Sequence, residues 1–378
     1  MLSSEFVLYS FDHLNLLLNY ISEKNIPLLS DVEFTNPLLW EIGHILYFFE
    51  VHYIKPLKLT HTELIRYGFK YDSLLCERKH RFDELLPLKK LMIIKDILIK
   101  TILSTFDRND YITWVNILHM HMHLESFYFT LRALGYNLLN PPQIETELTD
   151  KYTFSGIHSG RFLQGCNTLT EFCWDNEKPH FSVMCEGFYV ANECTSVLQY
   201  EEFIKADGYK NKSNWCYYGW KFINEKNITA PLYWEDQLNY KMRPVCHVSL
   251  YEARAYAKWL SKLHNKNYSL PTETQWEYMC KFIKPIHEST DYHPMENVNS
   301  GKQMMGNIWE WCDTRFYPYD GFRMDTLYKE FSYPFFGYKY IIKGGAWCVP
   351  AALITPHYRN AQLPENRVQY IGFRLIQK

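Results

Sequence analysis

A change of texture at the pair Pro141-Pro142 is the feature that most constrains how this 378-residue chain can fold. Before the pair, helix breakers are few and apolar residues recur at helical spacing. This pattern predicts four helices, near residues 9–24, 36–56, 88–106 and 110–135. Asn36-Pro37 is a helix start signal, and Gly135 with Asn137 is a stop signal. Four such helices with antiparallel connections predict a bundle.

After the proline pair, the segments become short and are punctuated by glycine, asparagine and aromatic residues. One helix is expected over 250–263, where Ala253, Ala257 and Leu260 share a face. The remainder has the texture of short strands and long loops, which predicts an irregular α+β domain. Because the texture changes within 141–155, we expect two domains, 1–145 and 146–378.

The overall composition excludes several classes of protein. Hydrophobic residues make up 47% of the chain, which supports packed cores rather than disorder. A net charge of −2 without a long charge block does not suit nucleic acid or an anionic membrane as a partner. No run of about 18 apolar residues is present, so no membrane span is expected.

The N-terminal sequence and the cysteines indicate the compartment. The N-terminus lacks the basic region and the small-residue cleavage site of a signal peptide. Ten cysteines are scattered along the chain, and none forms the C-x-x-C pair of a zinc ribbon or a thioredoxin motif. We therefore expect a soluble cytoplasmic protein with reduced thiols.

The segment HMHMHLE, residues 119–125, carries the most distinctive chemistry. On a helix, His119 and His123 lie one turn apart on one face, whereas His121 points about 200° away from His119. Two imidazoles at this spacing can bind one metal ion, and a third ligand must then come from another helix. His44, in the middle of the expected helix 36–56, is the candidate for that ligand.

Other interpretations of these histidines remain open. His52 is a rival to His44, although it lies about 80° further round the helix and nearer its end. Glu125 is about 200° from His123, so it suits a supporting role better than direct ligation. Histidines on apolar helix faces are also common as hydrogen-bonded core residues. Three imidazoles would suit either zinc or ferrous iron, and the helices alone do not distinguish them.

The second half of the chain carries ordered motifs of a known domain. These are the segment 244–278 (PVCHVSLYEARAYAKWLSKLHNKNYSLPTETQWEY), GNIWEWC at 306–312, KGGAWC at 343–348, and YRN with GFRL within 358–375. Over about 155–376 the chain closely resembles the formylglycine-generating-enzyme, or sulfatase-modifying factor, domain. The resemblance implies a C-type-lectin-like fold. Trp309 and Trp311 of GNIWEWC are expected in its core.

The first half resembles a DinB-like four-helix bundle, in which His44 and HMHMHLE match the metal-binding histidines. This domain order is similar to that of the ergothioneine-type sulfoxide synthases, or hercynine oxygenases. The segments at 172–183 (FCWDNEKPHFSV) and within 316–337 (FYPYDGF, YKEFSYPFFG) also resemble that family. The resemblance implies that His44, His119 and His123 hold Fe(2+) at a site between the two domains.

The same resemblance implies an activity. It is the oxygen-dependent formation of a C–S bond between a thiol, cysteine or γ-glutamylcysteine, and the imidazole of hercynine, in ergothioneine biosynthesis. A tyrosine of the second domain is expected to supply a proton, and the candidates are Tyr317, Tyr319 and Tyr328. Arg78 and Arg81 are candidates to hold a substrate carboxylate, since arginine forks bind carboxylates in bidentate fashion; an exposed basic loop is the alternative.

The substrate-binding segment departs from the family pattern. Asn360 is expected to line the pocket, but Gln362 and Asn366 stand where the sulfoxide synthases carry charges for the thiol substrate. Free cysteine is therefore the simpler sulfur donor. The segment at 71–87 (YDSLLCERKHRFDELLP) resembles the selenoneine synthases, which keeps a selenium donor open, and histidine in place of hercynine would correspond to the ovothiol type. Cys348 lacks the partner cysteine that formylglycine generation requires.

Two hypotheses from other classes compete with the oxygenase. One is a zinc-dependent thiol transferase of the DinB-like type. The other is a non-catalytic, lectin-like binding protein with structural histidines. Iron with thiol-dependent oxygen consumption, zinc without it, or no metal at all would distinguish the three.

Overall fold

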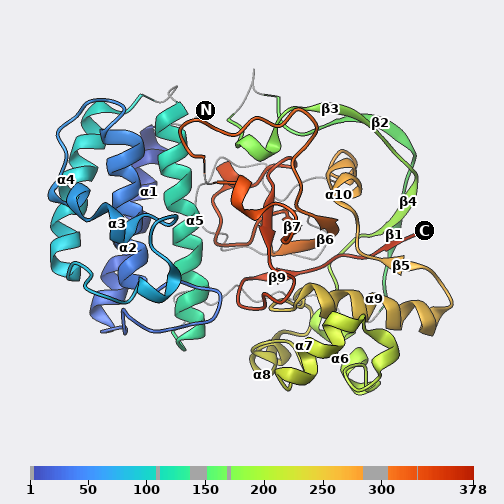
Figure 1. Cartoon of the computed structure of the whole chain (residues 1–378). Coiled ribbons are helices and arrows are strands. Elements are labelled where there is room, and N and C mark those ends of the chain that lie inside the picture. Colours follow the sequence, from blue (N-terminus) through green and yellow to red (C-terminus); the bar gives the residue numbers. More distant parts are fainter. Residues whose placement is uncertain (1–3, 108–110, 137–150, 168–171, 284–304, 330) are drawn as a thin grey trace. The chain divides into compact units, whose positions relative to one another are not determined.

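The computed structural model describes residues 4–107, 111–136, 151–167, 172–283, 305–329 and 331–378. The chain forms two compact units (Figure 1). The helical unit comprises Met1–Asn140 and Asp325–Phe331, and the mixed unit comprises Pro141–Met324 and Ser332–Lys378. The predicted domain boundary at 145/146, with Asn137 and Pro141-Pro142, lies outside the described residues.

The helical unit contains the four long helices that the sequence predicts, and one short helix. Their bounds are α1 Ser4–Glu23, α2 Leu38–Phe49, α3 Gly68–Tyr71, α4 Leu88–Thr105 and α5 Tyr111–Ala133. The helix α2 continues into a single π-helical turn, Glu50–Ile54. Its N-cap residue is Pro37 rather than Asn36, a shift of one residue. The predicted stop at Gly135 is confirmed, since this residue adopts the left-handed conformation with φ of 86°.

Two of these helices, α2 and α5, pack against each other; α2 buries nearly all of its side chains and α5 buries most of them. The helices α1 and α4 complete the packing, because α1 contacts α4 and α5, and α2 contacts α4. A helix that is buried on most sides carries few polar residues unless they have partners. The buried polar residues of α2 and α5 are therefore the first places to look for a site; they include Glu41, His44, His119, His121 and Glu125.

The mixed unit contains two four-stranded sheets and a two-stranded ribbon, so its α+β character is confirmed. The strand orders are β1-β4-β10-β5, β8-β7-β6-β9 and β2-β3, and every pairing is antiparallel except β6 with β9. The strands are β1 Phe154–Ile157, β2 Gly160–Gln164, β3 Phe181–Cys185, β4 Phe188–Ala191, β5 Tyr268–Ser269, β6 Trp309–Arg315, β7 Tyr340–Lys343, β8 Asn360–Gln362, β9 Ile371–Gly372 and β10 Ile376–Gln377.

Helices accompany these strands, and most of them were missed by the helix prediction for this half. Its helices are α6 Val197–Lys205, α7 Tyr217–Glu225, α8 Trp234–Gln237, α9 Leu250–His264 and α10 Glu273–Met279. Only α9 was predicted. The others have nine residues or fewer, too short for a clear period, but α6 and α10 begin with capping boxes that a local search would detect.

A buried ion pair connects two of the sequence motifs of the second half. Arg374 of GFRL forms two hydrogen bonds with Glu310 of GNIWEWC, each 3.1 Å long, and both side chains are buried. Trp276 donates its indole hydrogen to the same carboxylate at 3.0 Å. Trp309 and Trp311 are fully buried, as expected. A buried charge pair requires such complete satisfaction, so the motif residues depend on one another.

The expectation that all thiols are reduced is wrong for one pair. Cys166 and Cys173 form a disulfide across seven residues of sequence. The other eight cysteines are free. The sequence offers no C-x-x-C signal for this pair, because the pairing depends on the fold around the two sulfur atoms rather than on a short fixed spacing. Among the described residues, no helix has the length and apolarity needed to cross a membrane.

Candidate metal centre

Three imidazoles from α2 and α5 converge in the interior of the helical unit. One ring nitrogen from each of His44, His119 and His123 lies within 4.8 Å of the others. The ring of His44 is edge-on to both of the others, with centroids 5.2 Å from His119 and 4.8 Å from His123. The Nε2 atoms of His119 and His123 are 3.2 Å apart. We refer to these three residues as the imidazole cluster.

The outer nitrogens of two of these rings are held by hydrogen bonds. His44 Nδ1 lies 2.7 Å from the carbonyl oxygen of Tyr71, which can only accept, so Nδ1 donates and Nε2 keeps its lone pair. His123 Nδ1 lies 2.7 Å from Glu41 Oε1 and donates to it in the same way. The hydroxyl of Ser126 donates to the other carboxylate oxygen, Oε2, at 3.0 Å. Such outer partners fix the ring orientation of metal-binding histidines.

Aromatic side chains form the walls of the cluster. Phe48 stacks on the His119 ring with centroids 3.5 Å apart, and Trp40 stacks on the His44 ring at 4.8 Å. The Arg81 guanidinium lies over the Trp40 ring, 4.0 Å from the ring centroid. Apolar walls exclude water and lower the local dielectric constant, which strengthens any electrostatic interaction within the cluster.

Burial controls the charge state of these groups. Removal from water lowers the pKa of His44 and of His119 well below the usual range, and the neighbouring imidazoles lower it further. The pKa of His123 is also lowered, first by burial and then by the charge of Arg81. Burial raises the pKa of Glu41 to about 8. The three imidazoles are therefore neutral at neutral pH, the form in which histidine binds metal ions.

The cluster fits a metal ion better than it fits a purely structural role. Two Nε2 atoms face each other at 3.2 Å, and the buried Nδ1 of His119 has no hydrogen-bond partner among the described residues. A cation held by one nitrogen of each ring would bind the lone pairs that meet at this point, whereas Nδ1 of His119 would not take part. Three neutral imidazoles would leave coordination positions open for small ligands.

Of the three candidate tyrosines, only Tyr328 belongs to the helical unit, through the segment Asp325–Phe331. Its ring is edge-on to His119, with centroids 5.4 Å apart, and it contacts Phe48 at 4.8 Å. The segment is anchored where Tyr111 of α5 donates to Asp325 at 2.5 Å. Tyr328 therefore lies beside the imidazole cluster.

The other two candidate tyrosines have different surroundings in the mixed unit. Tyr317 is 53% exposed, and its backbone oxygen accepts from Arg359 at 2.9 Å. Tyr319 donates to Glu273 at 3.1 Å and lies under the Arg359 guanidinium at 4.0 Å. Arg359 itself pairs with Glu273 inside the fold through two hydrogen bonds of 2.6 and 3.1 Å. These contacts indicate that Tyr319 helps to stabilise the packing around Arg359 and Glu273.

The two arginines between α3 and α4 tie their loop to α2 and to the segment before it. Arg78 donates to Asp31 at 2.6 Å and to two backbone oxygens of residues 32 and 35. Arg81 donates to Asn36 at 2.7 Å and to two backbone oxygens of residues 73 and 76. At least three of the five N–H groups of Arg81 are thereby engaged.

The three candidates near the C-terminus form a local polar group. The Asn360 carboxamide oxygen accepts from the backbone N–H of Ala361 at 2.7 Å. Asn366 donates to the Gln362 side chain at 3.1 Å, and its own oxygen accepts from Val368 at 3.0 Å. Gln362 and Asn366, which replace the expected charges, are thus paired with each other. Asn366 is fully buried, whereas Asn360 and Gln362 are partly exposed.

Two other histidines of the helical unit lie outside the cluster. His52 is half-buried and packs on Phe48, with centroids 4.1 Å apart. His121 points to the opposite face of α5, as helical spacing predicts, and its Nε2 lies 2.8 Å from the Ser10 hydroxyl. Sequence reasoning missed Glu41, which holds His123. Its position three residues before His44 on one helix was an available signal.

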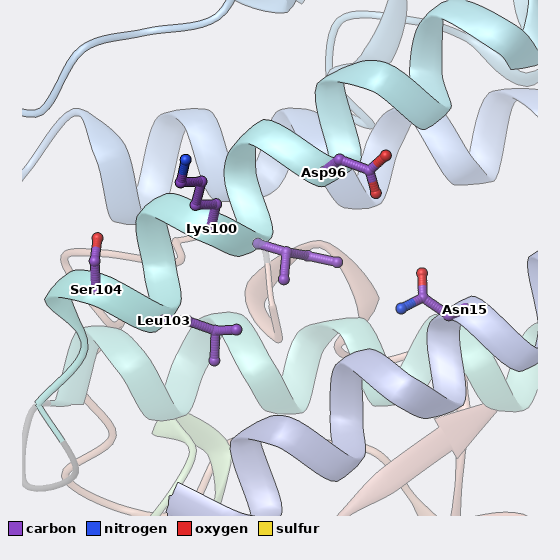
Figure 2. A pocket seen from close by; sticks show the side chains of 6 residues that line it. Asn15, Asp96, Lys100, Leu103 and Ser104 are labelled. Carbon is purple, nitrogen blue, oxygen red and sulfur yellow. The ribbon is translucent and has the colours of Figure 1, made fainter.

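A groove lies on the surface of the helical unit between α1 and α4, with a volume of about 460 Å³ (Figure 2). Its lining residues are Asn15, Asp96, Ile99, Lys100, Leu103 and Ser104. It contains a single carboxylate and a single ammonium group, and none of the residues of the imidazole cluster. This lining offers no ligand set for a metal ion.

The fold and the cluster define a class: a protein that joins a helical unit with a buried three-imidazole centre to an α+β unit. Residues 142–302 and 293–378 match the model of the family described as "Sulfatase-modifying factor enzyme 1-like domain". The match covers more than half of the chain, and the chain belongs to this family.

Similar proteins include two hercynine oxygenases. That of Mycobacterium tuberculosis is 29% identical over 254 residues, 57% of this chain and 58% of that protein. That of Mycolicibacterium smegmatis is 27% identical over 263 residues, 58% of this chain and 60% of that protein. "Ergothioneine biosynthesis protein 1" of Schizosaccharomyces pombe is 26% identical over 265 residues, 63% of this chain and 33% of that protein. The similarity thus spans less than two thirds of each relative.

Proposed function

We propose that this chain is a non-haem, Fe(2+)-dependent oxygenase of the sulfoxide synthase type. It joins the sulfur of a thiol to the imidazole of hercynine, a step of ergothioneine biosynthesis. The observation that carries the proposal is the convergence of His44, His119 and His123. The outer nitrogens of His44 and His123 are held by Tyr71 and Glu41. Its similarity to two hercynine oxygenases supports the choice of chemistry.

The protein's own part in this reaction is orientation and proton supply. When bound, ferrous iron supplies oxygen activation and deprotonation of a coordinated thiol. Glu41 and Tyr71 keep the imidazole lone pairs directed inward. Tyr328 is the proposed proton donor, because it is the candidate whose ring contacts the cluster. A tyrosine hydroxyl can serve as a general acid at short range.

The electrons of this reaction balance. Molecular oxygen accepts four electrons: two are released when the C–S bond forms and two when the sulfur becomes a sulfoxide. One oxygen atom ends in the sulfoxide and the other in water. No external reductant is therefore required for this step.

Arg78, Arg81, Asn360, Gln362 and Asn366 are the proposed substrate-binding residues. Arg81 is the stronger candidate for substrate binding of the two arginines, because its guanidinium stacks on Trp40, which in turn stacks on His44. The neutral pair of Gln362 and Asn366 suits cysteine as the sulfur donor better than the more highly charged γ-glutamylcysteine. A selenium donor, or histidine in place of hercynine, remains an alternative substrate.

The same proposal extends to the architecture. We interpret the helical unit as a DinB-like four-helix bundle, and the mixed unit as a formylglycine-generating-enzyme domain with a C-type-lectin-like fold. The proposed domains are 1–145 and 146–378. This interpretation is supported by the packing of α1, α2, α4 and α5 and by the family match of the second half.

The test is anaerobic reconstitution of the full chain with Fe(2+). Oxygen uptake is then recorded with hercynine or histidine against cysteine, γ-glutamylcysteine or a selenosugar, and products are identified by mass spectrometry. A sulfoxide product whose formation requires iron and a thiol supports the proposal. Zinc with thiol transfer and no oxygen uptake would establish the transferase instead, and a chain that binds no metal would be the binding protein.

A further inference from the structure

A second group of metal-binding side chains lies in the mixed unit and shares no residue with the imidazole cluster. It consists of Cys166, which follows β2, and of Cys173 and Glu177 around the short 3-10 helix Asp175–Glu177. Both sulfur atoms and a carboxylate oxygen lie within 4.8 Å of one another. All three residues are buried, with 1%, 3% and 2% exposure in that order.

Backbone contacts bring these three residues together independently of the disulfide. The Cys166 N–H donates to the backbone oxygen of Glu177 at 2.9 Å. The Glu177 carboxylate accepts from the Trp174 N–H at 3.2 Å, which fixes its side chain over the turn. Gly165, with φ of 89°, lets the strand approach this closely, since a Cβ there would lie 2.7 Å from the Glu177 backbone oxygen. Cys166, Glu177 and Trp174, the neighbour of Cys173, are therefore held together by contacts that do not involve the disulfide.

We propose that the reduced pair Cys166 and Cys173, together with Glu177, binds a thiophilic divalent cation of the zinc type. Two thiolates bound to one tetrahedral zinc ion lie about 3.8 Å apart, given Zn–S bonds of about 2.3 Å. The Cα atoms are 6.0 Å apart, a span that suits both this separation and the disulfide. Soft sulfur ligands with one carboxylate select zinc over calcium or magnesium.

His357 is the candidate for the fourth ligand. Its Nε2 lies 3.8 Å from Glu177 Oε2, so a small side-chain shift would bring the two atoms to the separation of about 3.4 Å that nitrogen and oxygen ligands have on one tetrahedral zinc ion. Two thiolates and a carboxylate carry three negative charges, so a divalent cation leaves one uncompensated. The buried ammonium of Lys343, whose charge acts on Glu177, offsets that charge while it also pairs with Glu277 at 3.5 Å.

Occupancy depends on the redox state of the cysteine pair. A small dithiol reductant supplies two electrons and two protons, which open the S–S bond to two thiols. The cation then replaces the two thiol protons, which pass to solvent. The two cysteines of this site are thus either joined in a disulfide or bound to the metal ion, and the two states exclude each other.

The site is connected to a segment that the proposed oxygenase would use. Asn176, beside Glu177, accepts from Arg359 at 2.6 Å and donates to the Arg359 backbone oxygen at 3.4 Å. If His357 bound the metal ion together with Glu177, a second interaction would connect the 3-10 helix Asp175–Glu177 to residues 357–360. The inference itself goes beyond the proposed function and does not depend on it.

The test uses Co(2+) as the metal probe on the full chain. After reduction and removal of the reductant under anaerobic conditions, cobalt is added and the near-ultraviolet sulfur-to-cobalt charge-transfer band is recorded. Histidine-only sites give no such band, so the imidazole cluster does not contribute. We expect the band in the reduced wild type, its absence in the oxidised protein, and its loss in Cys166→Ser and Cys173→Ser.

Matched variants complete the test. Cys185→Ser replaces another buried cysteine, at the end of β3, and should keep the band unchanged. Glu177→Gln should lower Zn(2+) affinity by more than about 100-fold, because even loss of an outer hydrogen-bond partner of a ligand costs about 10–100-fold. A reduced, folded wild type without the band overturns the proposal, even if the cysteine variants fail to fold. Persistence of the band in both cysteine variants also overturns it.

Discussion

The two faces of α5 carry histidines from one short run of sequence, yet the two environments differ. On one face, His119 and His123 converge with His44 of α2, and Glu41 holds His123. On the other face, His121 stacks on Phe6 of α1, with centroids 5.3 Å apart, and contacts the Ser10 hydroxyl. The first face assembles a ligand set, whereas the second pairs its histidine with a hydroxyl and an aromatic ring.

This difference shows what separates the candidate metal centre from a buried core histidine. Burial lowers the pKa of His121 well below its usual range, as it does for His119, so both rings are neutral. Desolvation therefore does not distinguish the faces. What distinguishes them is a third imidazole and a carboxyl group behind one ring. Together these groups direct several nitrogen lone pairs toward one position and fix the orientation of the rings.

The largest effect is expected from removing a ligand on the first face. His119→Ala should lower Fe(2+) affinity by more than about 100-fold, since the loss of a direct ligand exceeds the cost of losing an outer partner. Metal content after dialysis and competition with a chelator measure the affinity. His121→Ala is the matched control and should retain iron. Equal iron loss in the two variants, with both folded by circular dichroism, would remove the distinction between the faces.

The next effect concerns Tyr328. Tyr328→Phe should lower the turnover of the proposed reaction by about 10²–10⁴-fold, the usual contribution of a general acid, with iron affinity unchanged. Steady-state oxygen uptake and product formation measure it. Tyr317→Phe should leave turnover intact, because that side chain is mostly exposed. If turnover fell in Tyr317→Phe but not in Tyr328→Phe, the proton donor would be Tyr317.

A smaller effect is expected from the carboxylate that distinguishes the first face. Glu41→Gln should weaken Fe(2+) binding by about 10–100-fold, because His123 loses the carboxyl acceptor that orients its ring. Ser10→Ala removes the corresponding hydroxyl partner on the second face and serves as the control. Chelator competition on both variants gives the comparison. Unchanged affinity in Glu41→Gln would mean that the carboxylate has no role in orientation.

The smallest effect belongs to the second face and is one of stability. Tyr128 of α5 lies 2.7 Å from His13 of α1, and both side chains are buried. Tyr128→Phe removes this hydroxyl and should lower the free energy of unfolding by about 1–3 kcal/mol without changing iron affinity. Urea unfolding measures the first quantity. A concurrent loss of iron would show that the two faces are coupled through the helix.

The parts that follow from local spacing were predictable from the sequence. The four long helices, the shared face of His119 and His123 and the opposite direction of His121 all depend on a period of 3.6 residues. Glu41 was also within reach, since it lies one turn before His44. The choice of Tyr328 among three tyrosines was not, because it depends on where a distant segment of the chain packs.

Other features depend on the surroundings of a side chain rather than on its type. Arg78 and Arg81 suggested carboxylate forks, yet both donate to backbone oxygens. Arg78 binds those of residues 32 and 35, and Arg81 binds those of residues 73 and 76, and no sequence motif predicts these contacts. The Cys166–Cys173 disulfide depends on how the fold brings the two sulfur atoms together, and not on a recognisable spacing. Four short helices were missed for a related reason, since their few turns are stabilised by caps and tertiary packing rather than by a long apolar stripe.

The segment Asp325–Phe331 has a consequence for how such proteins can evolve. Because it belongs to the helical unit while its neighbours in sequence belong to the mixed unit, the polypeptide passes between the units three times. A gene rearrangement that exchanged only the first 140 residues would therefore leave behind the ring that contacts His119. A chimera between relatives that keeps this ring with its imidazole partners therefore needs three crossovers rather than one, at the three points where the chain passes between the units.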